Sequence, residues 1–180
     1  MELLDHQLDI LDRIYANRFL YIKSPRGLGI STTLQGFALT EALTNGKSII
    51  VFTHSQMFRY WMDFIKSHTF DEEILNYKRD YVSFRSEGTI ILKPISSSYG
   101  ICGYRNEIII IDDVPLSRIN DKLIFSIIPT LNNDSNDSHF IISGGGHPTI
   151  DLGRFGFHIM DLDDELGIFK PINKRTFIKW

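Results

Sequence analysis

Cysteine is nearly absent from this sequence of 180 residues, in which Cys102 is the one example. A single cysteine excludes an internal disulfide and any zinc site built from a cluster of cysteines. The six histidines are scattered and show no HExxH spacing. No apolar stretch approaches the roughly 18 residues needed to span a membrane. The N-terminus, MELLDHQLDILDRI, lacks the basic and then apolar layout of a signal peptide. We therefore expect a soluble protein of a reducing compartment that has no membrane partner.

Strong charge of one sign is also missing, because 19 basic and 22 acidic residues give a formal net charge of −3. This balance does not indicate a nucleic-acid binder, although a local basic patch remains compatible with it. Six prolines and 13 glycines imply no long disordered region. The length suits one globular domain of roughly 100–200 residues. We find no repeat or linker and expect a single domain over residues 1–180.

Hydrophobic periodicity predicts strands that alternate with helices. Helices are expected over residues 2–17, 31–45, 56–68 and 121–129, and buried strands over 19–22, 47–55, 108–111 and 139–143. Two further strands, 81–84 and 89–92, flank the turn signal Ser86-Glu87-Gly88 and predict a hairpin. The tail shows a mixed pattern with a short strand near 175–180. Such alternation predicts an α/β fold with a mostly parallel central sheet and helices on both faces.

A glycine-rich stretch, KSPRGLGIST, joins the first strand to the second helix. Loops of this kind bind phosphate, since glycines let successive backbone N–H groups point at an anion beside a helix N-terminus. Against the template GxxxxGK[ST] the stretch keeps Gly29 and Ser31, but Ser24 stands at the first glycine and Ile30 at the lysine. The sequence alone leaves two interpretations open, a phosphate-binding loop and a plain strand-to-helix turn.

Four isoleucines followed by Asp112 and Asp113 form the second motif. An apolar strand that ends in two acids is typical of a Walker B motif, in which the first acid holds Mg²⁺ and the second positions the attacking water. The alternative is that Asp112 ends a strand and Asp113 caps a helix. The carboxyl ends of parallel strands share one edge of the sheet, so KSPRGLGIST, DDVP and SGGGHP should converge there.

In their order and spacing these features resemble the ATPase domain of tailed-bacteriophage large terminases, the P-loop motors of the RecA/ASCE type that pump DNA into capsids. The resemblance covers nearly the whole chain. DHQLDILDRI is similar to the glutamine motif, RFLYIKSPRGLGIST to the Walker A region, and FIISGGGHP falls where the family has its coupling motif. The stretch between, VSFRSEGTIILKPISSSYGICGYRNEIIIIDD, resembles the family's hairpin, Arg-Gly turn and Walker B strand.

The resemblance implies ATP and Mg²⁺ as cofactors and assigns roles to residues. Asp113 would position the water, Ser31 and Asp112 would hold Mg²⁺, and Lys23 or Arg26 would supply catalytic positive charge. The nucleotide would contact Gln7, Ser24, Pro25, Arg26, Gly27, Leu28, Gly29, Ile30, Ser31 and Thr32. Ser143, Gly144 and His147 would couple hydrolysis to movement. The implied partners are double-stranded DNA, the portal, the small terminase subunit and further copies in a ring, in the cytoplasm of an infected bacterium.

The departures from the family pattern lie where the chemistry is done. Ile30 replaces the Walker A lysine, Asp113 replaces a glutamate, and Cys102 replaces the arginine of the Arg-Gly turn. Large terminases also carry a nuclease domain, which we do not expect within residues 1–180. Two functions therefore stay open. One is ATP-driven packaging of viral DNA, and the other is a catalytically degenerate domain that binds a partner or nucleic acid without hydrolysing ATP.

Overall fold

The computed structural model describes residues 4–25, 27–95, 106–114, 116–131, 137–145 and 149–162. Its helices are α1 (Asp5–Ala16), α2 (Ile30–Asn45), α3 (Met57–Ser67) and α4 (Asp121–Ile127). Its strands are β1 (Phe19–Lys23), β2 (Ser48–Thr53), β3 (Ile74–Lys78), β4 (Tyr81–Phe84), β5 (Thr89–Pro94), β6 (Ile108–Ile111), β7 (His139–Gly144) and β8 (His158–Asp161). Short 3₁₀ turns cover Asp71–Glu73, Leu116–Arg118, Ile128–Thr130 and Leu152–Phe155.

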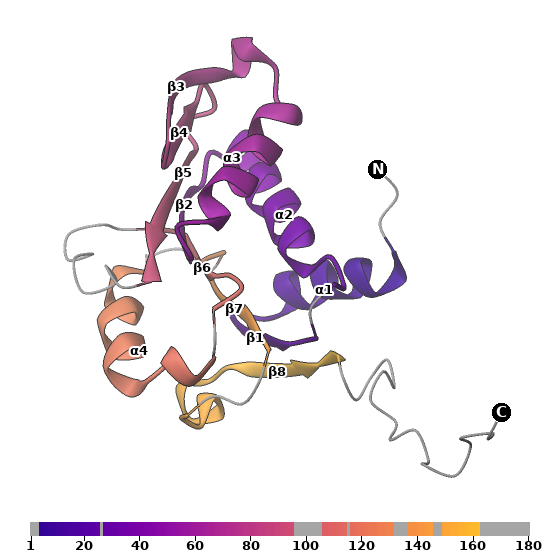
Figure 1. The fold of residues 1–180 in the computed structure, drawn as a ribbon, viewed down its shortest axis with the longest axis vertical. Helices are drawn as coiled ribbons and strands as arrows, with labels where there is room; N and C mark the ends of the chain where they lie inside the picture. The colour runs from indigo at the N-terminus through magenta and orange to yellow at the C-terminus, as the bar shows by residue number, and fades with distance from the viewer. Residues whose placement is uncertain are drawn as a thin grey trace, which may run out of the picture.

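The strands form one eight-stranded sheet in the order β3-β4-β5-β2-β6-β7-β1-β8 (Figure 1). In this order the six strands β5, β2, β6, β7, β1 and β8 pair in parallel with their neighbours. β3 and β4 add an antiparallel meander next to β5 at one edge. The predicted hairpin is confirmed, since β4 and β5 pair antiparallel across the Ser86-Glu87-Gly88 turn. The expected α/β class with a mostly parallel sheet is likewise confirmed.

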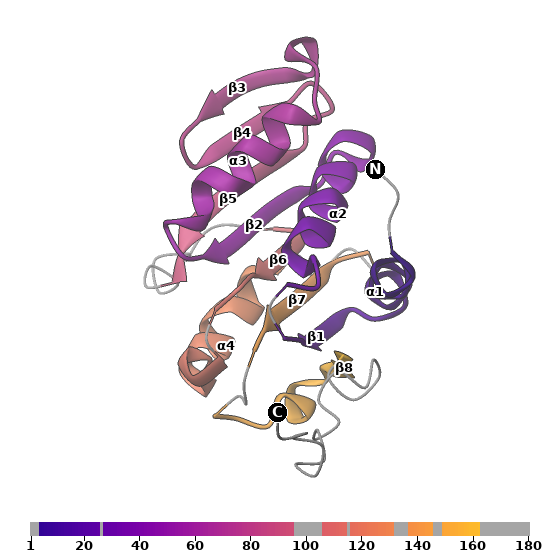
Figure 2. The ribbon, with the colours of Figure 1, turned by 45° about the vertical axis from the view of Figure 1, so that its right-hand side comes forward.

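Helices cover both faces of the sheet, and side-chain alternation along the strands explains why. In β6, Ile108 and Ile110 join the core beneath α1, α2 and α3, while Ile109 and Ile111 join the core beneath α4. Successive strand residues point to opposite faces, so an unbroken apolar run is buried on both sides. Figures 1 and 2 show α1, α2 and α3 together on one face and α4 on the other.

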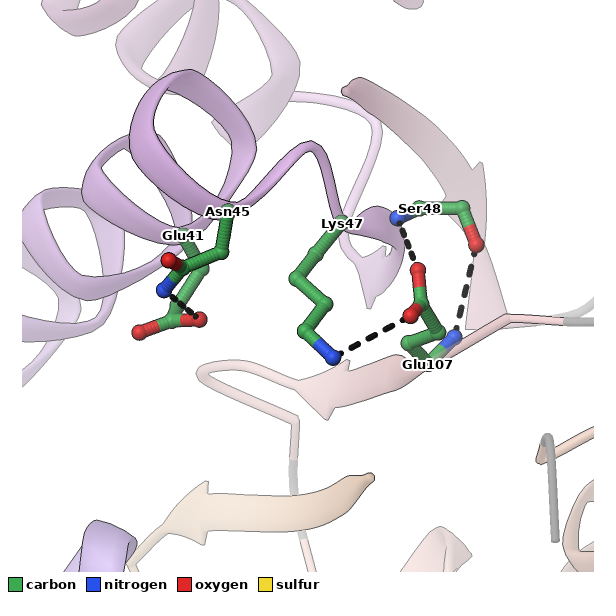
Figure 3. A network of polar contacts seen from close by, with 5 residues as sticks. All are labelled: Glu41, Asn45, Lys47, Ser48 and Glu107. Atoms are coloured by element: carbon green, nitrogen blue, oxygen red, sulfur yellow. Dashed lines mark hydrogen bonds and ion pairs between the residues drawn. The ribbon is translucent and has the colours of Figure 1, made fainter. Parts of the chain in front are cut away.

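Polar contacts fasten the amino ends of the central strands at the edge opposite the glycine loop (Figure 3). A carboxylate oxygen of Glu107 accepts a hydrogen bond from the Ser48 backbone N–H at 3.0 Å, and the other pairs with Lys47 Nζ at 3.1 Å. The Glu107 N–H donates to the Ser48 carbonyl at 3.0 Å. These contacts align the starts of β2 and β6 and so fix where both strands end.

Two strands were not expected from the sequence. β3 is an edge strand with mostly exposed residues, and β8 is a short edge strand of mixed character. The strand expected near 175–180 lies outside the described residues. Each helix in the described part of the chain is too short or too polar to cross a lipid bilayer.

Candidate functional site

A hollow of about 250 Å³ opens at the carboxyl ends of β1, β6 and β7, where ligands usually sit in open α/β sheets. These three strands are neighbours in the sheet, so the segments that follow them meet at one place. The hollow is lined by Ser24, Pro25, Gly27, Leu28, Gly29, Ile30, Ser31, Asp112, Asp113, Ser143, Gly144 and Gly145. The loop and the acids that the sequence motifs single out therefore face a common space.

The glycines of the loop have backbone conformations that other residues rarely adopt. Gly27 and Gly29 have φ of 92° and 71°, and Gly29 immediately precedes α2 without a side-chain cap. A Cβ atom on Gly29 would lie 2.7 Å from Gln7 Nε2. With no capping side chain, the first N–H groups of α2 are available to an anion, which the positive end of the helix dipole also favours.

Side chains of α1 form hydrogen bonds with backbone carbonyls of the glycine-rich loop. His6 Nε2 donates to the Leu28 carbonyl at 2.9 Å, and Gln7 Nε2 donates to the Gly29 carbonyl at 3.4 Å. Gln7 is buried, and its Oε1 accepts from the Leu4 N–H at 2.9 Å. The predicted adenine contact of Gln7 stays a prediction, because its side chain contacts the loop backbone and does not line the hollow.

Asp112 is fully buried and accepts three side-chain hydrogen bonds. Its Oδ1 accepts from Ser31 Oγ at 3.0 Å and from Ser143 Oγ at 2.9 Å, while its Oδ2 accepts from Trp61 Nε1 at 3.0 Å. Burial raises the pKa of Asp112; the three donors work against this rise, and the nearby Asp113 adds to it. The group is thus a carboxyl kept away from water and surrounded by hydrogen-bond donors.

Ser31 and Asp112 are a suitable pair of ligands for Mg²⁺, which prefers oxygen atoms. The contact between them joins the start of α2 to the end of β6, two segments 81 positions apart in the chain. Within the described residues no group of three or more histidines, cysteines or acids could hold a metal. A magnesium ion here would therefore need further oxygens from water or a phosphate, as it usually does.

Asp113 lines this hollow and also a second one of about 810 Å³. Its φ of 51° is unusual for a residue with a side chain. The second hollow is otherwise lined by His54, Gln56, Met57, Arg59, Tyr60 and Asp63. Asp113 thus stands between the loop and the exposed side of α3.

Among the described residues, none of the positions expected to supply positive charge presents a cation to the hollow. Ile30 lines the hollow, but it is only 7% exposed and belongs to the core beneath α1, α2 and α3. Lys23 ends β1 and donates to Asp161 Oδ2 at 2.5 Å, and it does not line the hollow. Arg26 lies outside the described residues.

The remaining predicted site residues have three different placements. Ser143 and Gly144 end β7 at the hollow, where Ser143 contacts Asp112. Thr32 instead lines a different hollow, between α1 and α2. His147 lies outside the described residues. The structure thus brings most of the loop, both acids and Ser143 together, whereas Gln7, Lys23 and Thr32 lie apart from the hollow.

Sequence reasoning missed His6 and Trp61 as neighbours of the site. The helical spacing of Phe58, Tyr60 and Trp61 in the sequence predicts that all three lie in the core. Trp61 and Phe58 are buried, but Tyr60 is 66% exposed, so that part of the expectation is wrong. Apolar spacing reveals a buried face, and nothing in it indicates that an indole N–H meets Asp112.

Comparisons with known proteins give no match at the level of sequence, either to a protein-family model or to a curated protein. Solved structures do match. The large terminase of bacteriophage HK97 has a TM-score of 0.66 and 12% identity, over 95% of this chain and 38% of that chain. A large terminase from a thermophilic bacteriophage, in complex with ADP, has a TM-score of 0.61 and 11% identity, over 97% of this chain and 49% of that one.

The bacteriophage Phi-29 viral genome packaging motor matches with a TM-score of 0.56 and 12% identity, over 82% of this chain and 50% of that chain. The chain therefore spans half or less of the length of each of these three proteins. Identities this low support a statement about fold. The chain has the P-loop NTPase fold of the large terminases and packaging motors of bacteriophages.

Proposed function

We propose that this chain is a terminase-like ATPase domain that binds ADP or ATP with Mg²⁺ and serves in the packaging of viral double-stranded DNA. The observation that carries the proposal is the hydrogen bond from Ser31 to Asp112, at the mouth of a loop with two left-handed glycines. It joins the hydroxyl and the carboxylate that a P-loop protein uses to hold Mg²⁺. The structural neighbour in complex with ADP supports the choice of ligand.

The roles of the residues follow from their places around the hollow. The N–H groups from Gly27 to Ser31 would bind the phosphates, and Ser31 with Asp112 would hold the magnesium ion. When bound, Mg²⁺ neutralises charge on the phosphates of the nucleotide. Asp113 would orient a water molecule. Ser143, a residue of β7 in contact with Asp112, would couple hydrolysis at the site to movement of β7.

The partners are proposed from the neighbours rather than from a surface of this chain. A packaging motor acts on viral DNA, and the Phi-29 motor is among the matching structures. We extend this to double-stranded DNA, a portal, a small terminase subunit and a ring of copies, inside an infected cell. Ring assembly would let neighbouring copies complete each other's sites.

A catalytically degenerate domain that binds a partner or nucleic acid without hydrolysing ATP is the second candidate, and the surroundings of Ile30 favour it. This position carries an apolar side chain, and Lys23 is paired with Asp161. The loss of one preorganised charge costs on the order of 10²–10³ in rate. We therefore expect weak ATP binding and slow hydrolysis.

Calorimetry with ADP and ATP, with and without Mg²⁺, tests the binding. Sub-micromolar affinity for ATP would contradict the expected effect of Ile30, while no binding at all would overturn the proposal. Ser31→Ala is expected to remove the effect of Mg²⁺ on affinity and to leave weak binding of free ADP.

Steady-state ATP hydrolysis separates the two candidates. If the domain hydrolyses ATP, Lys23→Ala or Arg26→Ala should slow the hydrolysis. Equal rates in the unmodified protein and these two variants would remove both residues from the mechanism. Ile30→Lys restores the usual charge and should raise the rate by about 10²–10³ if the missing lysine is the cause. No gain from this variant would favour the binding domain.

A further inference from the structure

The two carboxylate oxygens of Asp112 have different neighbours. Oδ1 accepts hydrogen bonds from Ser31 and Ser143, which both line the hollow. Oδ2 accepts from Trp61 Nε1 at 3.0 Å, and Trp61 does not line the hollow. One oxygen is therefore turned to the proposed ligand, and the other is held from within the core.

Trp61 is well placed to fix the carboxylate, because it cannot easily move itself. It lies in the middle of α3, is 0% exposed and packs in the core beneath α1, α2 and α3. Its indole N–H is a donor and never an acceptor, so it can meet only an acceptor oxygen of Asp112. A hydrogen bond to an ionised group is also stronger than one between neutral groups.

We propose that Trp61 is a positioning residue of the magnesium site, which holds Oδ2 of Asp112 so that Oδ1 faces the cation and Ser31. The inference rests on the proposed function. Partners behind a metal ligand set its orientation, and their loss typically lowers metal affinity by about 10–100-fold. Trp61 acts through Asp112 and touches neither the nucleotide nor the cation.

Trp61 is by the same contact a built-in reporter of the site. The sequence has two tryptophans, Trp61 and Trp180, so Trp180→Phe leaves Trp61 as the only fluorophore of its kind. A cation bound at Oδ1 of Asp112 changes the electron density on Oδ2, to which the indole N–H of Trp61 donates. Addition of Mg²⁺ in the presence of ADP should therefore change Trp61 fluorescence and shift its indole N–H resonance, whereas ADP alone should change them less.

The test compares Trp61→Phe with Phe58→Leu. Trp61→Phe keeps an aromatic ring and removes the donor, whereas Phe58→Leu removes packing from the same helix, at a residue that is 8% exposed and has no polar side-chain atom. Calorimetric titration of Mg²⁺ into each protein with saturating ADP should give about 10–100-fold weaker affinity for Trp61→Phe alone. Binding of ADP without Mg²⁺ should be equal in both variants and the unmodified protein.

Equal Mg²⁺ affinity in Trp61→Phe and the unmodified protein would overturn the inference and leave Trp61 as a core residue. Equal losses in Trp61→Phe and Phe58→Leu would overturn it as well, since packing alone would explain them. If Trp61→Phe does not fold, the indole resonance of the Trp180→Phe protein decides, and no shift with Mg²⁺ and ADP would reject the inference. An unmodified protein that binds no ADP at all would reject the proposed function itself, and this inference with it.

Discussion

Asp112 illustrates at the scale of one residue how a candidate site can lower the stability of the fold. It is fully buried, and burial is the largest cause of its raised pKa. A carboxyl group whose pKa is higher in the folded than in the unfolded chain stabilises the fold when it is protonated. That contribution is lost as the pH rises through the folded pKa. Above the pKa of the unfolded aspartate, burial of Asp112 therefore costs free energy of folding, because folding then buries a charge or takes up a proton.

Asp112→Asn should accordingly raise the free energy of unfolding at neutral pH, by roughly 0.5–2 kcal/mol, while it removes the Mg²⁺ effect on binding. An amide oxygen can accept from Trp61, and the amide nitrogen can donate to the hydroxyls of Ser31 and Ser143. The gain should disappear below about pH 4, near the pKa of an unfolded aspartate, since Asp112 is then neutral as well. Urea unfolding at pH 7.5 and at low pH measures it.

Asp113→Asn is the control, because Asp113 is only partly buried and the same change should give a smaller gain. Equal stability of the Asp112→Asn and unmodified proteins at all pH values would contradict this account of the buried charge.

The residues of the site were predictable where the backbone motif dictates them. Two acids after an isoleucine strand, and a serine two positions after Gly29, identify Asp112 and Ser31 as neighbours of the hollow, and the structure places them in contact. Trp61 was not predictable as a partner of Asp112, since that contact depends on how α3 packs on the sheet. Arg26 lies outside the described residues, so the positive charge assigned to it stays a prediction.

At the scale of elements, the sequence predicts the central strands and the helices and misses two edge strands. β6 is a run of four isoleucines buried on both faces, so its composition alone identifies it. In β3, Leu75 and Tyr77 are 59% and 40% exposed, and no residue of the strand is fully buried. An edge strand gains much of its stability from backbone pairing, which leaves little trace in residue types.

The hairpin turn between β4 and β5 packs against α2, and this contact gives a prediction about stability. A Cβ atom on Gly88 would lie 2.0 Å from the Ala42 carbonyl oxygen, and Ser86 Oγ donates to that same oxygen at 2.7 Å. Gly88→Ala must therefore push the turn away from α2 and should cost about 1–3 kcal/mol or more, as overpacking does. Urea unfolding followed by circular dichroism measures the loss.

Glu87→Gly is the matched variant in the same turn. Glu87 has a φ of 71°, which glycine adopts without strain, so this change should be neutral or slightly stabilising. A loss of stability in Glu87→Gly as large as that in Gly88→Ala would show that the turn tolerates no change, and it would refute the steric explanation.

Glu107 gives a second prediction about elements, at the amino ends of β2 and β6 (Figure 3). Glu107→Ala leaves the Ser48 N–H without its side-chain acceptor and Lys47 without this acid, and it should cost about 1–3 kcal/mol. Glu107→Gln keeps an acceptor for Ser48 and should lose at most about 1 kcal/mol, since the ion pair is partly exposed. Equal losses in chemical denaturation would show that the ion pair matters more than the backbone contact.

At the scale of the whole molecule, the site exists only because distant segments meet. Ser31, Asp112 and Ser143 lie in three separate parts of the chain, and neighbouring parallel strands bring them to one edge. The alternation of strands and helices is enough to predict this convergence. It does not predict that Lys23 would pair with Asp161 on β8, a strand that the sequence did not reveal.

A ligand that bridges these segments should stabilise the molecule as a whole. Binding to the folded state alone adds about 2.7 kcal/mol at a ligand concentration 100 times Kd. For a chain of this size each kcal/mol raises Tm by about 2–4 °C, so saturating Mg²⁺ and ADP should raise Tm by about 5–10 °C.

Calorimetric scans of the unmodified protein and Ser31→Ala measure this rise in Tm. The variant should lose the part of the shift that depends on Mg²⁺, because its loop can still bind phosphate through backbone N–H groups but no longer offers the hydroxyl. A shift of equal size in both proteins would mean that Ser31 holds no cation, and that the nucleotide, if it binds in this hollow, does so without the contact between α2 and β6.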